Sequence, residues 1–419
     1  MPGAASVARF KVLLLIFLVA AITYADRLLI SAAATAISRD FSLTPSRMGM
    51  IFSAFALAYA LFEVPSGWWG DVIGTRKALT RIVLCWSAFT ILTGASVGFV
   101  SLLAVRFLFG ACEAGAFPMI ARTVSRWFPV SEQGRAMSTA FLGLALGASV
   151  TTPLALPLIA VHGWRTAFVA FGAIGSLWCL VWYAWFRDTP EEHPSVNQAE
   201  LEKIRAGTTP TPSHARIDWV RLVRSPNMLY ICGMYFAYGY GLYFYITWLP
   251  TYLLKGRGFS AADAGWLSSM PWVVAAAGFV LGGYLTDRIA ARTGSLRMAR
   301  CALGATGYAI SACALVAVAL TPDRWVAAGL LAVASFFQML TASAAWSVCL
   351  DVGRKNAGVV SGFMNTAGNL GGALAPVVMG YIVEYLHSWE YPFFVSAAVF
   401  GGGVLFWVMV NPRKALEVQ

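Results

Sequence analysis

The amino-acid sequence predicts an all-α polytopic membrane protein, with twelve transmembrane helices in two pseudo-symmetric halves of six. The composition is the first observation: 59% of the 419 residues are hydrophobic and 12% are charged, whereas soluble domains contain about 25% charged residues. The mean hydropathy of +0.69 agrees with this. Second, apolar runs of about 20 residues or more, the length that crosses a bilayer, recur along the chain. Third, most charges lie in the short segments between these runs.

The expected spans follow from the length of each apolar run and from the turn residues that end it. In the first half they cover residues 10–37, 47–70, 78–98, 100–121, 135–161 and 164–187. In the second half they cover residues 227–254, 263–288, 299–320, 325–350, 357–386 and 390–411. The polar stretch between the halves contains prolines and a short helical pattern at Asn197–Arg205, and we interpret it as a linker. We therefore expect an N-terminal half at residues 1–187, a cytoplasmic linker at 188–226 and a C-terminal half at 227–419.

The formal net charge of +11 is distributed as in a membrane protein. Most Lys and Arg residues lie near the two ends of the chain and in the even-numbered connections between spans. Because positively charged connections stay on the cytoplasmic side, this pattern predicts that both termini are cytoplasmic. No basic stripe lies on a soluble domain, so we expect no binding of nucleic acid.

Cysteine and histidine residues give no sign of a metal site or a catalytic centre. The seven cysteines are scattered singly, without the spacing of metal ligands or of a disulfide framework. The four histidines fall in expected loops or at helix ends. A membrane-embedded enzyme would need a metal cluster or a nucleophile beside a base, so we expect no enzymatic activity. The linker and the C-terminal tail are too short for the signalling domain of a receptor.

The stretch from Arg106 to Pro118 carries the most informative charges. Arg106 and Glu113 lie seven residues apart in a long apolar run, so they share one helix face about 10 Å apart along the axis. Each costs roughly 3 kcal/mol or more at the centre of a bilayer, so this face is expected to look into the protein interior or a watery cavity. One interpretation is a structural ion pair between helices, and the other is a site that binds an anion and carries a proton.

A second charged pair, Asp26-Arg27, lies inside the first apolar run. Arg27 and Arg106 each offer a permanent guanidinium that can bind a carboxylate through two hydrogen bonds. Carboxylates in a dry site take up protons near neutral pH more readily than in water, although neighbouring arginines oppose this, so Asp26 and Glu113 are candidate proton carriers. The alternative for Asp26-Arg27 is an ion pair at a helix end that reaches toward the membrane interface.

A glycine-rich, charged segment, Gly67-Trp-Trp-Gly70-Asp71-Val-Ile-Gly74-Thr-Arg76-Lys77, follows the second span. Its glycines permit a tight turn, Asp71 can accept hydrogen bonds from a helix N-terminus or pair with an arginine, and the basic residues hold the cytoplasmic side. The segment resembles the loop between helices two and three of the major facilitator superfamily, in which it gates the conformational change. The positions that carry the resemblance are Gly67, Asp71, Gly74, Arg76 and Lys77, with a partial second copy at Gly283, Asp287 and Arg288. This resemblance implies the major facilitator fold, with two parallel halves around a central site.

Further segments resemble the anion:cation symporter family, whose members take up sugar acids such as hexuronates and galactonate and whose relatives carry glutamate and sialic acid. The resembling positions are Tyr24, Asp26, Arg27, Tyr59, Arg106, Gly110, Glu113, Phe117, Pro118, Tyr245, Trp248, Pro250, Asn365, Gly368 and Asn369. The resemblance implies that Asp26 and Glu113 are the protonation sites. It also implies that Arg27 and Arg106 bind the charge of the substrate or couple it to the proton.

Tyrosine and tryptophan side chains are further candidates for contact with the substrate. Tyr59 can offer a hydroxyl group to the cavity. Tyr243 and Trp248 precede Pro250, where a gating half-helix is expected to bend. Aromatic residues in a span more often serve packing, and this remains the alternative. Trp346 is a weaker candidate of the same kind.

Two amides in the eleventh span, Asn365 and Asn369, lie four residues apart and need hydrogen-bond partners in an apolar surrounding. Those partners are either the hydroxyl groups of a polyol acid or a neighbouring helix.

The sequence as a whole predicts a secondary active transporter that imports an organic anion, a sugar acid or related carboxylate, together with protons by alternating access. An exchanger or exporter of an organic anion is the alternative. A channel is disfavoured because buried acidic and basic residues together suit alternating coupling better than a continuous pore. The resemblance implies a monomer in a plasma membrane, the inner membrane in a bacterium, with a small organic anion as substrate. We expect no cofactor and no metal, with the proton as the coupling ion.

Overall fold

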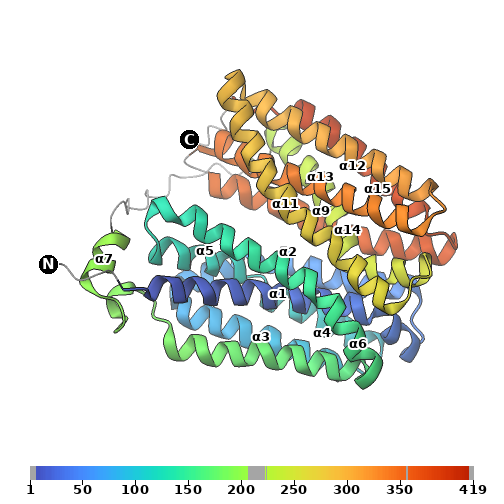
Figure 1. Cartoon of the computed structure of the whole chain (residues 1–419), viewed down its shortest axis with the longest axis horizontal. Coiled ribbons are helices and arrows are strands. Elements are labelled where there is room, and N and C mark those ends of the chain that lie inside the picture. Colours follow the sequence, from blue (N-terminus) through green and yellow to red (C-terminus); the bar gives the residue numbers. More distant parts are fainter. Residues whose placement is uncertain (1–5, 206–221, 223, 355–356, 415–419) are drawn as a thin grey trace. The chain divides into compact units, whose positions relative to one another are not determined.

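The chain is described by a computed structural model that covers residues 6–205, 222, 224–354 and 357–414 (Figure 1). Every regular element among these residues is a helix. Nine helices in this part of the chain are long and apolar enough to cross a membrane. The prediction of an all-α, polytopic membrane protein is therefore confirmed.

The fifth and sixth expected spans form the two arms of α6 (Val130–Trp185), which meet at a non-helical kink at Gly163, where φ is 80°. The kink lies between the expected spans 135–161 and 164–187, so this predicted boundary is confirmed. Two further expected spans correspond to α3 (Thr75–Gly94) and α9 (Pro226–Thr247). The first of these begins with basic residues and the second is rich in tyrosine, so both are too polar to count among the nine. The fourth span is interrupted by a turn at residues 114–115, which the sequence did not predict.

The described residues within 1–30 and 58–213 form a first compact unit. It contains α3, α6 and the first part of α1 (Ala8–Asp40), together with the second part of α2 (Pro45–Ile73). The remaining helices are α4 (Phe99–Glu113), α5 (Ala116–Trp127) and α7 (Gln198–Arg205), with a 3-10 turn at Pro190–Glu192. Within this unit α3 packs against α4, α5 and α6.

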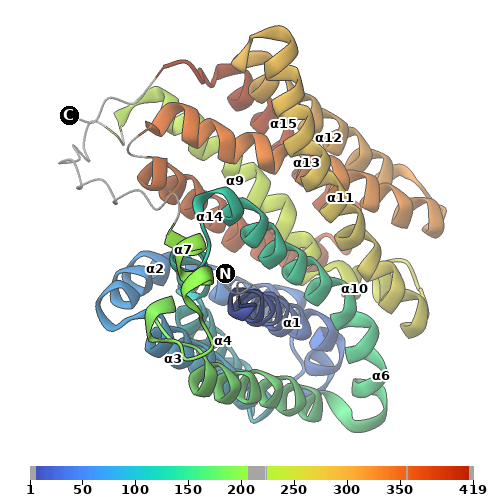
Figure 2. The same cartoon turned by 60° about the vertical axis from the view of Figure 1, so that its left-hand side comes forward.

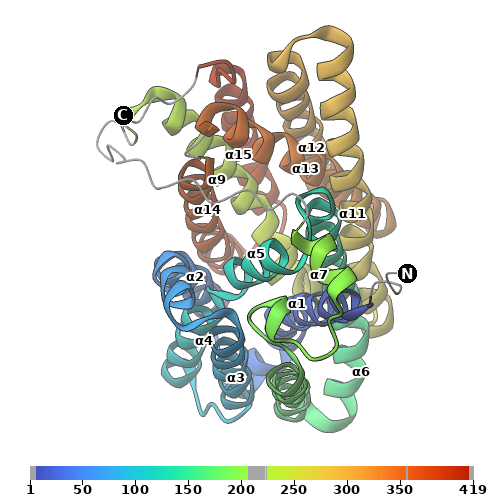
Figure 3. The ribbon, with the colours of Figure 1, turned by 90° about the vertical axis from the view of Figure 1, so that its left-hand side faces the viewer.

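The described residues within 31–57 and 214–419 form a second compact unit. Its helices are α9, α10 (Leu249–Thr251), α11 (Ala261–Thr293), α12 (Leu303–Leu320), α13 (Arg324–Gly353), α14 (Ala357–Tyr385) and α15 (Tyr391–Met409), with π-helical turns at Tyr252–Gly256 and Arg297–Ala302. Helix α9 lies beside α14 and α15, whereas α12 lies beside α13 and α15 (Figure 3).

Small residues bring α6 close to α1 in the first unit. A Cβ atom on Gly143 would lie 2.3 Å from a backbone oxygen of α1, and one on Gly147 would lie 2.1 Å from the oxygen of Ala21. Any larger side chain would push the helices apart, so these glycines set the spacing. The second part of α6 also contacts α1, because the indole N–H of Trp178 donates to the oxygen of Leu15 at 3.1 Å. Helix α6 therefore packs closely on the part of α1 that precedes Asp26 and Arg27.

The linker helix α7 is attached to the beginning of α1 (Figure 2). Glu200, which is fully buried, accepts hydrogen bonds from the backbone N–H groups of Ala8 at 3.3 Å and Arg9 at 3.1 Å. It thereby caps the N-terminus of α1, whose first N–H groups have no partner within the helix. Glu132 of α6 adds ion pairs with Arg9 at 3.5 Å and Lys203 at 3.4 Å.

In the second unit, the last part of α1 contacts α9, and the first part of α2 contacts α14. The hydroxyl of Ser31 donates to the oxygen of Thr247 at 2.5 Å, and that of Ser53 donates to the oxygen of Ala373 at 2.5 Å. A Cβ atom on Gly49 would lie 2.3 Å from the oxygen of Pro376, so this approach requires glycine. This close packing forms one wall of a pocket at the same end of the unit.

Candidate functional site

A buried ion pair joins α1 and α4 in the first unit. Arg27 donates from Nε to Oε1 of Glu113 at 2.5 Å, and the two residues are 6% and 0% exposed. The guanidinium of Arg27 also lies 4.6 Å from the centre of the Tyr59 ring and 4.9 Å from that of Tyr24. Three of the residues predicted from sequence, Arg27, Tyr59 and Glu113, are thus brought together from three helices.

Arg106 lies on the predicted face of α4, but it is not the residue that forms the ion pair with Glu113. It shares a buried face with Glu113 on α4, as the helical period predicted. The carboxylate of Glu113 nevertheless forms its ion pair with Arg27 of another helix, and the guanidinium carbon of Arg106 lies 4.3 Å from the centre of the Phe109 ring. Arg106 still acts electrostatically on Glu113. The sequence therefore predicted the right cluster but could not assign the pairing within it.

Asp26 is 1% exposed and turns toward α3. Neither of its carboxylate oxygens has a hydrogen-bond partner among the described residues. The indole of Trp86 and the hydroxyl of Thr90 are its polar neighbours, and the indole N–H likewise lacks a partner of normal geometry in the described residues. A buried carboxyl group without a hydrogen bond is costly when ionised, so this position is suited to a group that holds a proton. Trp86 was not predicted, because nothing in the sequence distinguishes it from a packing residue.

Three residues predicted in the second half, Tyr243, Asn369 and Trp346, form side-chain hydrogen bonds. The hydroxyl of Tyr243 donates to Oδ1 of Asn369 at 3.4 Å, so α9 meets α14. The indole N–H of Trp346 donates to the hydroxyl of Tyr235 at 3.1 Å. Asn365 is half-buried one turn before Asn369 on α14. This group offers amides and hydroxyl groups, which suit a hydroxylated ligand.

Trp248 does not belong to that group. It is buried at the end of α9, where its indole N–H donates to the oxygen of Pro376 at 3.1 Å. Its ring packs edge-on against Phe52 at 5.4 Å and against Trp389 at 6.1 Å. The structure therefore places Trp248 against α2, α14 and Trp389.

The first predicted gating segment is held at its end by an acidic residue that the sequence analysis missed. Gly74 has a φ of 85°, and a Cβ atom there would lie 2.8 Å from Oδ2 of Asp188. Asp188 accepts a hydrogen bond from the backbone N–H of Arg76 at 2.8 Å. The guanidinium Nε of Arg76 donates to the oxygen of Tyr183 at 3.0 Å, while Lys77 is exposed. The surroundings of Gly67 and the side chain of Asp71 lie outside the described part of the chain.

The second gating segment ends in a network around Arg300. Its Nε donates to Oδ2 of Asp351 at 3.0 Å, and its NH1 lies 3.8 Å from Oδ1 of Asp287. Arg288 contacts the hydroxyl of Tyr284. A Cβ atom on Gly283 would meet nothing closer than 3.8 Å, so no steric reason requires glycine there. Arg300 and Asp351 were missed because they are far from the motif in sequence.

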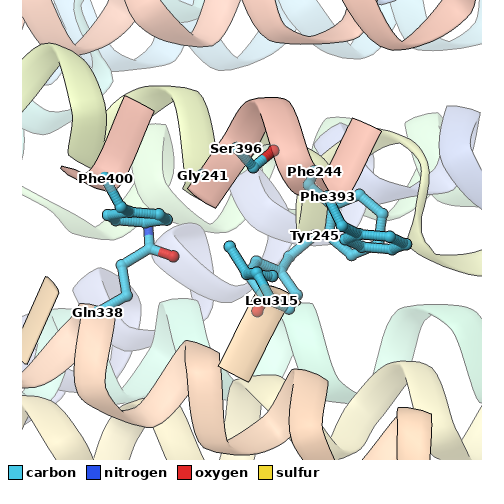
Figure 4. A pocket seen from close by; sticks show the side chains of 8 residues that line it. All are labelled: Gly241, Phe244, Tyr245, Leu315, Gln338, Phe393, Ser396 and Phe400. Atoms are coloured by element: carbon cyan, nitrogen blue, oxygen red, sulfur yellow. The ribbon is translucent and has the colours of Figure 1, made fainter. Parts of the chain in front are cut away.

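The cavity drawn in Figure 4 lies inside the second unit and is too small for an organic acid. Its volume is about 10 Å³, close to the space that one water molecule needs. Gln338 and Phe400 lie at one end, and Phe244, Tyr245 and Phe393 at the other (Figure 4). The amide of Gln338 donates to the backbone oxygen of Tyr238 at 2.7 Å, which is a structural role.

Comparison with known proteins identifies the family of the chain. The family model described as Major Facilitator Superfamily matches residues 16–376. The chain is 38% identical to a protein of Cupriavidus necator named a probable sulfoacetate transporter, over 94% of this chain and 92% of that one. It is 31% identical to a D-galactonate transporter of Escherichia coli, over 97% and 96% of the two chains. It is 30% identical to a hexuronate transporter of Bacillus subtilis, over 93% and 92%.

The fold is also that of a solved transporter. A bacterial homologue of the human lysosomal transporter Spinster, in an inward-facing and unoccupied conformation, matches with a TM-score of 0.79 at 20% identity. The match covers 99% of both chains. The family predicted from the motifs is thus confirmed: the chain belongs to the major facilitator superfamily, among relatives named as transporters of sugar acids and other organic anions.

Proposed function

We propose that this protein is a secondary active transporter that imports an organic anion together with protons. The observation that carries the proposal is the buried Arg27–Glu113 ion pair beside the unpartnered carboxyl group of Asp26. The relatives named for sulfoacetate, galactonate and hexuronate support an anionic substrate. The substrate class is a sugar acid or a short carboxylate or sulfonate.

The ion pair gives a direct way to couple a proton to an anion. While Glu113 is ionised, its carboxylate occupies the guanidinium of Arg27 and competes with any other anion. When Glu113 takes up a proton, Arg27 becomes available to the carboxylate or sulfonate group of the substrate, which it can bind through two hydrogen bonds. Loss of that proton restores the competition and favours release. Asp26 would hold a second proton in the same cluster.

The remaining parts of the molecule have supporting roles in this proposal. In the first unit, Tyr59 and Arg106 complete the anion site. In the second unit, Tyr243 and Asn369 offer hydroxyl and amide groups that suit the hydroxyl groups of a sugar acid. The two gating segments stabilise one conformation during alternating access. The protein acts as a monomer in a bacterial inner membrane with both termini in the cytoplasm, and it needs no cofactor.

The experiment is uptake by proteoliposomes under an imposed inward proton gradient. Sulfoacetate, D-galactonate, D-glucarate and D-glucuronate are compared with neutral sugars of the same size. Wild-type protein should accumulate at least one acid and no neutral sugar, and it should lose accumulation when the gradient is collapsed. Accumulation that does not depend on the gradient would favour exchange, and uptake of neutral sugars alone would refute the anion site.

Glu113→Gln tests the coupling, with Glu132→Gln as the matched control. Glu132 also forms ion pairs but is 25% exposed at its side chain and lies outside the cluster. The Glu113 variant should lose gradient-driven accumulation and retain exchange of a preloaded acid, whereas the control should behave as wild type. Accumulation at the wild-type level by the Glu113 variant would remove this residue from the mechanism.

A further inference from the structure

A second polar pocket lies in the second unit, apart from the cluster of Arg27 and Glu113. It has a volume of about 60 Å³ and lies between the end of α1, the α1–α2 turn and the π-helical turn after α10. Its polar lining consists of Thr35, Ser38, Thr251 and Lys255, and the rings of Trp248 and Trp389 form part of its wall. The distribution of Lys and Arg predicts that this end of the unit faces the outside of the cell.

Two residues that line this pocket carry hydroxyl groups without partners among the described residues. The Oγ1 atoms of Thr35 and Thr251 are buried, and neither has a hydrogen-bond partner among the described residues. Thr251 as a whole is only 5% exposed. Most buried hydroxyl groups in proteins are hydrogen-bonded, so two orphans that line the same pocket indicate a missing ligand or water.

Lys255 supplies the positive charge of the pocket. It is the exposed member of the lining, and it forms no ion pair with any residue that the structure describes. It lies in the π-helical turn Tyr252–Gly256, a type of distortion that is frequent at functional sites. A Cβ atom on the neighbouring Gly256 would lie 3.0 Å from Cγ of Trp389, so glycine is needed for this ring to close the wall.

We propose that this pocket binds the anionic head group of the transported substrate, a carboxylate or a sulfonate, before it reaches the central site. One ammonium group and two hydroxyl groups provide three donor groups, enough for the two oxygens of a carboxylate or the three of a sulfonate. The volume is about four times the space that one water needs, which suits a head group or a two-carbon acid. It is far below the several hundred Å³ of a pocket that encloses a whole ligand. The inference rests on the proposed transport of organic anions.

The test measures initial uptake of labelled sulfoacetate and D-galactonate in right-side-out and inside-out membrane vesicles. Lys255→Gln should raise the KM in right-side-out vesicles about tenfold, the effect of losing a hydrogen bond to a charged group, with Vmax unchanged. Thr251→Val keeps the volume and should raise the KM about threefold. Lys255→Arg should stay near wild type. Arg39→Gln is the matched control, because Arg39 is an exposed cation at the same helix end that does not line the pocket.

The KM in inside-out vesicles should not change, because the pocket lies at the opposite end. An unchanged KM in right-side-out vesicles, or an equal rise in both orientations, overturns the inference, since the second result is that of a general structural defect. Each measurement is repeated at low and high chloride. If Lys255→Gln only abolishes a chloride effect and leaves the KM unchanged, the occupant is an inorganic anion and the inference is wrong. Wild-type vesicles that take up neither acid would instead remove the proposed function, and this inference with it.

Discussion

Replacement of Glu113 by glutamine should destabilise the empty protein and at the same time tighten its binding of an anion. Glutamine keeps the shape of the side chain but removes the charge that compensates Arg27. The pair is almost completely buried, with side-chain exposures of 7% and 0%. Removing one partner of such a pair costs about 3–5 kcal/mol, because the other charge is left uncompensated. We expect a loss near the lower limit, since the amide oxygen can still accept from Nε of Arg27.

The gain in affinity follows from the same geometry. An anion that binds wild-type protein must displace a charge-assisted hydrogen bond worth about 1.5–3 kcal/mol and compete with a negative charge. In the variant it displaces only the weaker hydrogen bond to a neutral amide oxygen. Binding should therefore be at least about tenfold tighter. At the anion concentration that half-occupies the wild-type site, binding stabilises the wild type by about 0.4 kcal/mol and the variant by about 1.4 kcal/mol or more.

Unfolding in mixed detergent micelles, followed with and without the acid identified by the uptake panel, measures both effects. Glu132→Gln is the control, because partly exposed ion pairs contribute about 0–1 kcal/mol and its carboxylate lies outside the cluster. If the Glu113 variant is as stable as wild type and gains no more from the ligand, then Glu113 does not compete with the substrate for Arg27. The coupling mechanism would then have to be abandoned.

Three further outcomes are expected from the first unit. Gly147→Ala would place a Cβ atom 2.1 Å from the oxygen of Ala21 and should lower stability by about 1–3 kcal/mol, whereas Gly134→Ala, with nothing within 4 Å, should be neutral in the same thermal-unfolding assay. Glu200→Ala should lower the free energy of unfolding by about 0.5–2 kcal/mol, because it removes the cap of α1. Proteolysis near the linker should accelerate, and an unchanged cleavage rate would contradict the attachment of α7 to α1. Burial lowers the pKa of His193 below 6.5, so the neutral imidazole is favoured in the folded protein. The contribution of this imidazole to folding stability is therefore complete above pH 6.5 and is lost as the pH falls. The unfolding midpoint should decrease on acidification less in His193→Phe than in wild type.

The sequence predicted the helices well because the bilayer imposes their length and composition. The break of α6 at Gly163 coincides with the predicted boundary between the fifth and sixth spans, whereas the turn that splits the fourth span depends on local backbone geometry that apolar length does not encode. The same limit applies to charges. The helical period places Arg106 and Glu113 on one face, but the partner of Glu113 is 86 residues away in the chain, on α1. Only the crossing of two helices decides that pairing.

Residues that act through long-range contacts were missed for a related reason. Asp188, Glu200 and Arg300 are ordinary charged residues in polar segments, and nothing near them in sequence indicates a partner. Each becomes informative only when the fold brings a helix end or a gating segment to it. The position of Trp248 before Pro250 indicated a substrate contact, but only the fold shows that its neighbours are Phe52 and Trp389.

The charges of the cluster also bear on how many protons accompany the substrate. Asp26 and Glu113 carry two negative charges when ionised, and Arg27 and Arg106 carry two positive charges, so the buried cluster is formally neutral. A monoanion that enters without a proton would leave one uncompensated negative charge in a site that is almost inaccessible to water, and such a charge is strongly disfavoured. One proton on Glu113 restores neutrality and frees Arg27 in the same step. A dianion needs a second proton, and Asp26 is the remaining carboxyl group of the cluster that can hold it. A transporter built on these four residues should therefore couple its proton number to the charge of its substrate.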